Sequence, residues 1–404
     1  VPGSGAGVVV VDVSDPVAPR EVLRTGDGAY DHYALAGHYL YAAGYSSYDT
    51  RRQRGLRIYD VSTPGRPIEE NVAHGVVPAV SDLAIDGPHL YAATNAGLRV
   101  YDVEAAYAVY ELARFATAEA VDAVDLLGDR AYITHGGLVE VVDVADPRAP
   151  RGLGSLRVAE RPTMAGETGI AAGAGVVIAT VPGSGVHVID AADASHLSEL
   201  VRLGTDLPAV SYRVAVEDRH AYVLDSTALR VVDVSDPAGP VARGSYSRGA
   251  PGDALRALAV NGTIVYVLVW AQGSDRQELH VLDVSDPASP RRVALLEMGD
   301  EAPHELLVRG GYAYVTAQDH DPVTGDPIER LHVLDVSDPT APRQVGVLDL
   351  PGVLPSGVVH RRSSGFSRCT SSIKMASIPV TKRSNRVTEV VLTACRTSSR
   401  SQFR

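Results

Sequence analysis

The sequence predicts an all-β protein, a β-propeller built from four-stranded blades, and three observations support this. An apolar run ending in Asp recurs eight times along the 404 residues. The Asp returns at intervals of about 41 to 52 residues, the length of one four-stranded blade. A second apolar unit, usually centred on Tyr, lies between consecutive copies. Helical repeats are excluded because no stretch shows a 3.6-residue hydrophobic period.

The first unit is typical of a buried strand followed by a tight turn. Val8–Pro16 reads VVVVDVSDP and Leu279–Pro287 reads LHVLDVSDP. Apolar residues on both faces suit a sheet that is covered on both sides. Pro cannot donate to a strand ladder, and Asp accepts backbone N–H groups in an Asx-turn, so we interpret the repeated Asp as structural. The repeated Asp residues are Asp12, Asp60, Asp102, Asp143, Asp190, Asp233, Asp283 and Asp335. The copies at 102–106 and 190–194 lack Ser-Asp-Pro, and we expect their turns to differ.

The second unit predicts a hairpin in which an apolar strand and a turn precede a small-Tyr-apolar strand. Turn residues such as Gly87-Pro88 and Gly128-Asp129 come directly before the Tyr strand. One copy, Val177–Ile178–Ala179, lacks the Tyr. In each blade, this hairpin supplies strands a and b, and the Asp hairpin supplies strands c and d. The Tyr residues are Tyr41, Tyr91, Tyr132, Tyr222, Tyr266 and Tyr314.

The repeat count predicts eight blades: seven complete ones and an N-terminal half blade at 8–24, with a seven-bladed ring as the alternative. A propeller closes without an open edge by completing one blade from both chain ends. The partner hairpin is expected after Leu350, where the composition changes. We therefore divide the chain into a propeller, 1–350, and a basic Ser/Arg-rich tail, 351–404. The tail is either disordered or, from about residue 357, read out of frame, and Val387–Thr393 is its only strand candidate.

Charge separates the same two parts. Residues 357–404 carry eight Arg, two Lys and one Glu, a net charge of +9. Because the whole chain has a net charge of −12, residues 1–356 have a net charge of −21. Such an acidic body argues against nucleic-acid binding, which needs a basic surface. No apolar run approaches the roughly 20 residues that span a bilayer. The sequence begins at Val1 without a recognisable signal peptide.

The amino-acid sequence of the Asp strands, such as LRVVDVSDP at Leu229–Pro237, resembles the repeats of the LVIVD-repeat family of bacterial β-propellers. The resemblance covers roughly residues 8–348. Many members of that family are secreted or attached to the cell surface, and the family has no common activity. The resemblance therefore implies an extracellular or cell-surface location and leaves the ligand open.

Polar residues at the start of strand a predict a ligand-binding mouth at the centre of the ring. They either bind a ligand or a cation, or form the solvated rim of a channel. Aligned on the Tyr, one level holds Asp31, Ser81, Asp122, Tyr212, Arg256 and His304, and the next holds His32, Asp82, Arg213 and Glu305.

Three long b–c loops, Gly44–Gly55, Ala271–Glu278 and Gln318–Arg330, are expected on one arc of the ring, where binding residues often lie. The arc includes Tyr45, Tyr48, Arg52 and Arg276. Asp319, Asp321 and Asp326 form a candidate site for Ca²⁺ or another divalent metal. Their spacing does not match an EF-hand, so a solvated acidic hairpin tip is the alternative.

Enzymatic motifs such as H-E-x-x-H or a nucleophile elbow are missing. We therefore predict a non-enzymatic binding or scaffolding protein, expected to be a monomer, that recognises a protein or a glycan through this face. The alternative is a metal-dependent enzyme that uses His32, His304 and Glu305 at the channel mouth.

Overall fold

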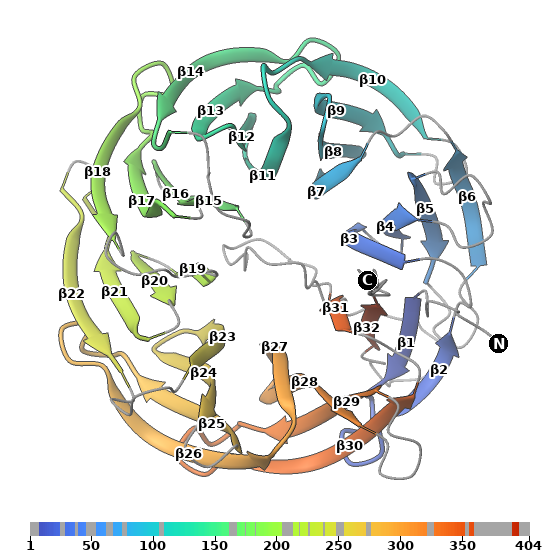
Figure 1. Ribbon diagram of the computed structural model, residues 1–404, viewed down its shortest axis with the longest axis vertical. Coiled ribbons are helices and arrows are strands. Elements are labelled where there is room, and N and C mark those ends of the chain that lie inside the picture. The colour runs from blue at the N-terminus through green and yellow to red at the C-terminus, as the bar shows by residue number, and fades with distance from the viewer. Residues whose placement is uncertain are drawn as a thin grey trace, which may run out of the picture.

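The computed structural model is a ring of four-stranded antiparallel sheets arranged around a central axis (Figure 1). It contains no helix in the residues that it describes, and hence none there that is long and apolar enough to cross a membrane. The described residues are 8–24, 29–36, 39–45, 54–61, 68–74, 79–104, 109–160, 168–173, 175–181, 183–203, 213–217, 219–224, 227–236, 239–247, 254–271, 276–320, 327–351, 355–358 and 390–395.

Seven blades are each made of four consecutive strands, as the repeat predicts. The first four blades are β3 (Ala29–Ala36), β4 (Tyr39–Tyr45), β5 (Arg54–Asp60) and β6 (Ile68–His74); β7 (Val80–Asp86), β8 (His89–Thr94), β9 (Gly97–Asp102) and β10 (Tyr110–Phe115); β11 (Val121–Leu127), β12 (Arg130–His135), β13 (Leu138–Asp143) and β14 (Arg151–Arg157); and β15 (Gly169–Gly173), β16 (Val176–Val181), β17 (Gly185–Asp190) and β18 (Ser198–Leu203). The other three are β19 (Arg213–Glu217), β20 (His220–Leu224), β21 (Leu229–Asp233) and β22 (Val241–Tyr246); β23 (Ala254–Asn261), β24 (Ile264–Ala271), β25 (Arg276–Asp283) and β26 (Arg291–Gly299); and β27 (Ala302–Arg309), β28 (Tyr312–His320), β29 (Pro327–Asp335) and β30 (Arg343–Pro351).

The N-terminal half blade belongs to an eighth sheet that both ends of the chain build. Its order is β2-β1-β32-β31, with β1 (Val8–Asp12), β2 (Arg20–Arg24), β31 (Pro355–Val358) and β32 (Val390–Cys395). β32 overlaps Val387–Thr393, the tail segment that the sequence identifies as a strand candidate. The boundary at residue 350 and the reading frame of the tail stay predictions, because residues 359–389 and 396–404 lie outside the described part.

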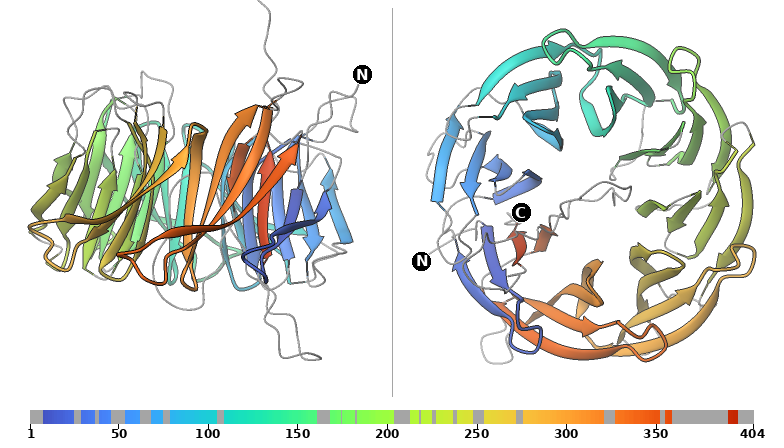
Figure 2. Two further views of the ribbon diagram at one scale, coloured as in Figure 1. Left: turned by 90° about the horizontal axis from the view of Figure 1, so that it is seen from below. Right: turned by 180° about the vertical axis from the view of Figure 1, so that it is seen from behind.

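The N-terminal hairpin packs directly against the last complete blade, and this contact closes the ring. Val9 and Val11 share one buried apolar cluster with Leu331 and Val333 of β29. Gly346 of β30 lies against the β1–β2 turn, where a Cβ on this glycine would meet the Pro16 carbonyl oxygen at 2.2 Å. β1 and β2 are therefore neighbours of β29 and β30 in the ring, although the two pairs of strands are distant in sequence (Figure 2).

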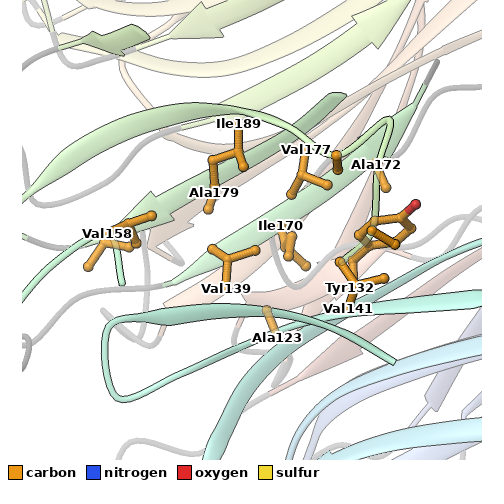
Figure 3. Close-up of a cluster of buried hydrophobic side chains, with 13 residues drawn as sticks. Ala123, Tyr132, Val139, Val141, Val158, Ile170, Ala172, Val177, Ala179 and Ile189 are labelled. Atoms are coloured by element: carbon orange, nitrogen blue, oxygen red, sulfur yellow. The ribbon is translucent and has the colours of Figure 1, made fainter. Parts of the chain in front are cut away.

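The core consists of apolar layers between neighbouring blades. Figure 3 shows one layer, in which Tyr132 and Val141 of one blade face Ile170 and Val177 of the next. The repeated Tyr residues of strand b are all buried, which confirms their structural role. Burying a large apolar side chain contributes roughly 2 kcal/mol, so this layer repeats a substantial stabilising contact around the ring.

The repeated Asp forms the predicted Asx-turn. Asp12 Oδ1 accepts the Ser14 N–H at 3.0 Å, and equivalent bonds follow Asp143, Asp233, Asp283 and Asp335. The two divergent copies keep this bond: Asp102 accepts from Glu104 at 3.0 Å and Asp190 from Ala192 at 2.9 Å. We expected these two turns to differ, but this hydrogen bond is the same in them as in the other copies. The reason is that the carboxylate needs only a main-chain N–H two residues later.

Candidate ligand-binding face at the ring mouth

Apart from Tyr212, the predicted mouth residues lie on the inner strands, the strands nearest the centre of the ring (Figures 1 and 2). The first aligned level coincides with a β-bulge in five of these strands, where one residue falls out of register. Such bulges re-aim side chains and are frequent beside binding sites. The bulged residues are Asp31, Ser81, Asp122, Arg256 and His304. Tyr212 and the side chains of Asp31 and His304 lie outside the described part.

Two residues of the second level meet across the mouth. Arg213 Nη2 of β19 lies 3.7 Å from Glu305 Oε1 of β27. The blade β23–β26 stands between these two strands in the ring order. Both side chains are largely buried, with 14% and 12% of their surface exposed. Solvent therefore screens this pair less than it screens an ion pair on the outer surface.

Asp82 ties two neighbouring inner strands together. Its Oδ2 accepts the Val124 N–H of β11 at 3.0 Å, and its Oδ1 accepts the adjacent Leu83 N–H at 2.8 Å. Asp125, which the sequence analysis did not select, repeats the arrangement by accepting the Ala172 N–H of β15 at 3.0 Å. Part of the polar mouth is therefore structural, since these carboxylates join adjacent blades.

Asp122 is the mouth residue with the most perturbed acidity among those described. Burial raises the pKa of Asp122 to about 6, His135 opposes this rise, and Glu119 adds to it. His135 is buried and its Nε2 lies 2.8 Å from Glu140 Oε2, while its Nδ1 is buried without a partner. A carboxyl that titrates near neutrality at the mouth marks a candidate functional position.

The long b–c connections are partly strand. The ladder between β4 and β5 reaches Tyr45, that between β24 and β25 reaches Arg276, and that between β28 and β29 passes Asp319. These three predicted loop residues therefore lie in strands, because hairpin pairing continues toward the mouth. His32 and Arg256 are described on their inner strands, His32 half-buried and Arg256 exposed. Tyr48, Arg52, Asp321 and Asp326 lie outside the described part.

Asp319 and Arg276 are both engaged in ion pairs. Asp319 Oδ2 lies 3.1 Å from Arg330 Nη1, and Arg330 also contacts Glu301 and Asp349. Arg276 pairs with Glu297. Among the described residues, no group of three or more His, Cys, Asp or Glu side chains has a geometry that holds a metal ion. The proposed metal site at 319–326 stays a prediction, because two of its three carboxylates are not described.

Sequence reasoning missed a series of buried Arg and His residues on strand c, each of which pairs with a Glu. Three residues before the repeated Asp, several blades carry Arg or His in an otherwise apolar run. His187 lies 2.6 Å from Glu199, His280 lies 2.7 Å from Glu278, and Arg99 lies 2.5 Å from Glu111. Burial lowers the pKa of His187, and the hydrogen bond that the imidazole donates to Glu199 opposes this change. The interrupted apolar run was the available signal for these pairs.

Glu329 and Gln277, six residues before the repeated Asp in adjacent blades, were also missed. Glu329 is 1% exposed and neither carboxyl oxygen makes a hydrogen bond of good geometry. It lies on the β29 face that carries Leu331 and Val333, toward β1. Burial raises the pKa of Glu329 well above its usual range; the Thr316 hydroxyl opposes this rise, and the Glu301 and Glu305 carboxylates add to it.

Gln277 is fully buried and its Oε1 has no partner. Gln277 pairs in register with Trp270, the only Trp of the chain, which is partly exposed. The mouth ends of β23–β26 and β27–β30 thus combine an aromatic side chain, a buried unpaired amide oxygen and a cluster of charges. Such a mixture is typical of recognition surfaces.

The ring also resembles solved structures in its fold. It matches a computationally designed protein, Ika8, with a TM-score of 0.61 and 12% identity over 91% of this chain and 96% of that chain. It matches Sqt1 of Saccharomyces cerevisiae with a TM-score of 0.60 and 8% identity over 92% and 97%. Sqt1 of Chaetomium thermophilum, bound to the N-terminus of the ribosomal protein L10, matches with a TM-score of 0.60 and 12% identity over 91% and 97%. At these identities the likeness concerns the fold alone.

Ring, blade topology and inter-blade core together define a β-propeller of four-stranded blades. The LVIVD repeat family model matches residues 3–26, 211–248, 251–294 and 304–349. The chain is therefore a β-propeller that contains LVIVD repeats, which confirms the resemblance seen in its repeat sequence. No curated protein matches the sequence significantly.

Proposed function

We propose that this protein is a non-enzymatic scaffold that binds a protein segment at the mouth ends of β23–β26 and β27–β30. The observation that carries the proposal is the continuation of these two hairpins toward the mouth as paired strands, which present Trp270, Arg276 and Asp319 on a rigid edge. Partly exposed aromatic and Arg side chains are favoured at protein-binding surfaces. The propeller of Chaetomium thermophilum Sqt1, which binds a protein N-terminus, supports the proposal by analogy of fold.

Peptide and glycan arrays test the proposal and distinguish the two ligand classes. Labelled protein is expected to bind peptide spots, and Trp270→Ala is expected to lose most of that binding. Leu153→Ala, on the outer strand β14 and 39% exposed, is the matched control and should bind as the native protein does. Binding confined to glycan spots would contradict a protein ligand and indicate that the ligand is a carbohydrate. Equal binding by both variants would show that the binding site does not lie on this edge.

The alternative is a metal-dependent enzyme that uses His32, His304 and Glu305. The ion pair of Glu305 with Arg213 supports the scaffold instead, because a guanidinium beside the carboxylate competes with a metal ion. Elemental analysis of the purified protein and of His304→Ala tests this alternative. One Zn, Fe or Cu per chain that is lost in the variant would favour the enzyme, and its absence from the native protein would reject it.

An extracellular or cell-surface location is part of the same proposal. The support is the family resemblance, since many LVIVD-repeat proteins are exported. The gene sequence upstream of the Val1 codon tests it. A charged segment followed by a short apolar segment and a small-residue cleavage site is the expected result. Cytoplasmic recovery of the protein from its native cells would contradict the proposed location.

A further inference from the structure

The closing blade differs from all other blades in how its two inner strands are connected. In each of the seven complete blades, two residues separate strand a from strand b, as Gly87 and Pro88 separate β7 from β8. In the closing sheet, residues 359–389 separate β31 from β32. A short turn fixes a hairpin partner, whereas a long connection adds a closure cost that grows with its length. The connection that precedes β32 is therefore far longer than the connection that precedes any other strand b.

Strand pairing in the closing sheet is also uneven. β32 pairs with β1 at every position from Val8↔Ala394 to Asp12↔Val390. Its pairing with β31 is limited to Pro355↔Cys395 and Val358↔Thr393, with an irregular register between them. The edge of β1 is thus the principal attachment of β32.

The accepting edge is held in place by contacts that do not involve β32. Val9, Val11 and Val13 pack into the apolar cluster of the last complete blade, and β2 pairs along the other edge of β1. Gly346 lies against Pro16 of the adjoining turn. A hairpin supported in this way keeps its inner edge in position when the strand on that edge leaves.

From these three observations we infer that β32 is an exchangeable strand, and that the edge of β1 accepts β32 from a second copy of this chain. The donated strand has the same sequence as the resident strand, so the exchanged pairing recovers the same main-chain hydrogen bonds. Reciprocal exchange gives a closed two-fold dimer, the usual outcome of domain swapping. A tethered strand has an effective concentration of about millimolar, so the monomer is favoured in dilute protein and the exchanged dimer gains at high concentration.

Single-cysteine variants test the exchange directly. In a Cys369→Ser, Cys395→Ser background, one chain carries Val9→Cys and another carries Thr393→Cys, two positions that the register places opposite each other. After mixing at high protein concentration under mild oxidation, a disulfide-linked heterodimer is expected. Its yield should rise with concentration, and a chain carrying both substitutions should form an internal disulfide that prevents dimerisation.

A regular blade supplies the matched control. Ala221→Cys and Val232→Cys, on separate chains, occupy opposed positions of β20 and β21. This pair should yield at least tenfold less heterodimer, because a two-residue connection precedes β20. Equal yields for both pairs would overturn the inference, as would an internally linked Val9→Cys/Thr393→Cys chain that still dimerises. An identical circular dichroism spectrum for all variants shows that they have folded.

Discussion

Arg213 and Glu305 form an ion pair at 3.7 Å although they belong to inner strands separated by a whole blade. The pair reaches across the mouth of the ring, and both partners come from a level that the repeat alignment selects. It therefore couples the positions of β19 and β27. A ligand bound at the mouth would contact a surface whose charges are already fixed in place.

A double-mutant cycle on Arg213→Met and Glu305→Gln is expected to give a coupling of about 1 kcal/mol in the free energy of unfolding, since the partners are largely buried and few solvent ions reach them. Urea unfolding of the four proteins measures it. The exposed pair of Arg276 and Glu297 is the control and should show much weaker coupling. Equal coupling for both pairs would contradict a special role for the mouth pair.

Asp122→Asn is expected to stabilise the protein near pH 8 by roughly 1 to 3 kcal/mol. The folded pKa of Asp122 is raised to about 6, above that of the unfolded chain, so ionisation opposes folding as pH rises. The gain should develop between about pH 4 and pH 6 and vanish below pH 4. Thermal unfolding across this range, with the exposed Asp129→Asn as control, checks both size and direction. A gain that is independent of pH would exclude the titration of Asp122 as its cause.

Glu329→Gln is expected to stabilise the protein at neutral and alkaline pH. The pKa of buried Glu329 is raised, so its contribution to stability is complete at low pH and is lost as the carboxyl ionises with rising pH. The opposite exchange in the adjacent blade, Gln277→Glu, should cost several kcal/mol above neutrality because it buries a charge without a partner. Denaturant unfolding at pH 5 and pH 9 measures both changes. Destabilisation by Glu329→Gln at pH 9 would contradict this account.

Gly346→Val is expected to weaken ring closure by at least about 2 kcal/mol. A Cβ at residue 346 would meet the Pro16 carbonyl oxygen at 2.2 Å, and neither backbone can move without displacing a turn. Hydrogen exchange of β1 and β2 should increase most. Gly239→Ala is the control, since a Cβ there meets Asp236 at an ordinary 3.7 Å. Unchanged protection in β1 would show that this contact does not hold the blade.

Most of the architecture is predictable because each blade corresponds to one copy of a sequence repeat. The Asx-turn of Asp12 and the buried Tyr132 follow from local chemistry, and eight copies remove ambiguity about strand order. The alignment of strand a on the Tyr also places the bulged residues of five inner strands at one level. A bulge displaces one residue at a fixed distance from the turn, so the alignment carries this information.

The site was only partly predictable because its contacts depend on ring geometry. No sequence spacing indicates that Arg213 reaches Glu305, since these two side chains approach each other past an intervening blade of the ring. Some buried strand c residues have partners on another strand, as His187 has Glu199 of β18 at 2.6 Å. The burial of Glu329 depends on the continuation of β29 toward the mouth, where the sequence indicated a loop.

The central claim is that the ring closes between the N-terminal hairpin and the last complete blade. Double electron–electron resonance between two spin labels tests this claim most directly. Spin labels at the exposed residues Val17 and Val347 flank the contact of Pro16 with Gly346. Because packed sheets lie about 10 Å apart, a narrow distance distribution on the order of 20 Å or less is expected. A broad distribution centred at several tens of ångströms would show an open array of blades and contradict the closed ring.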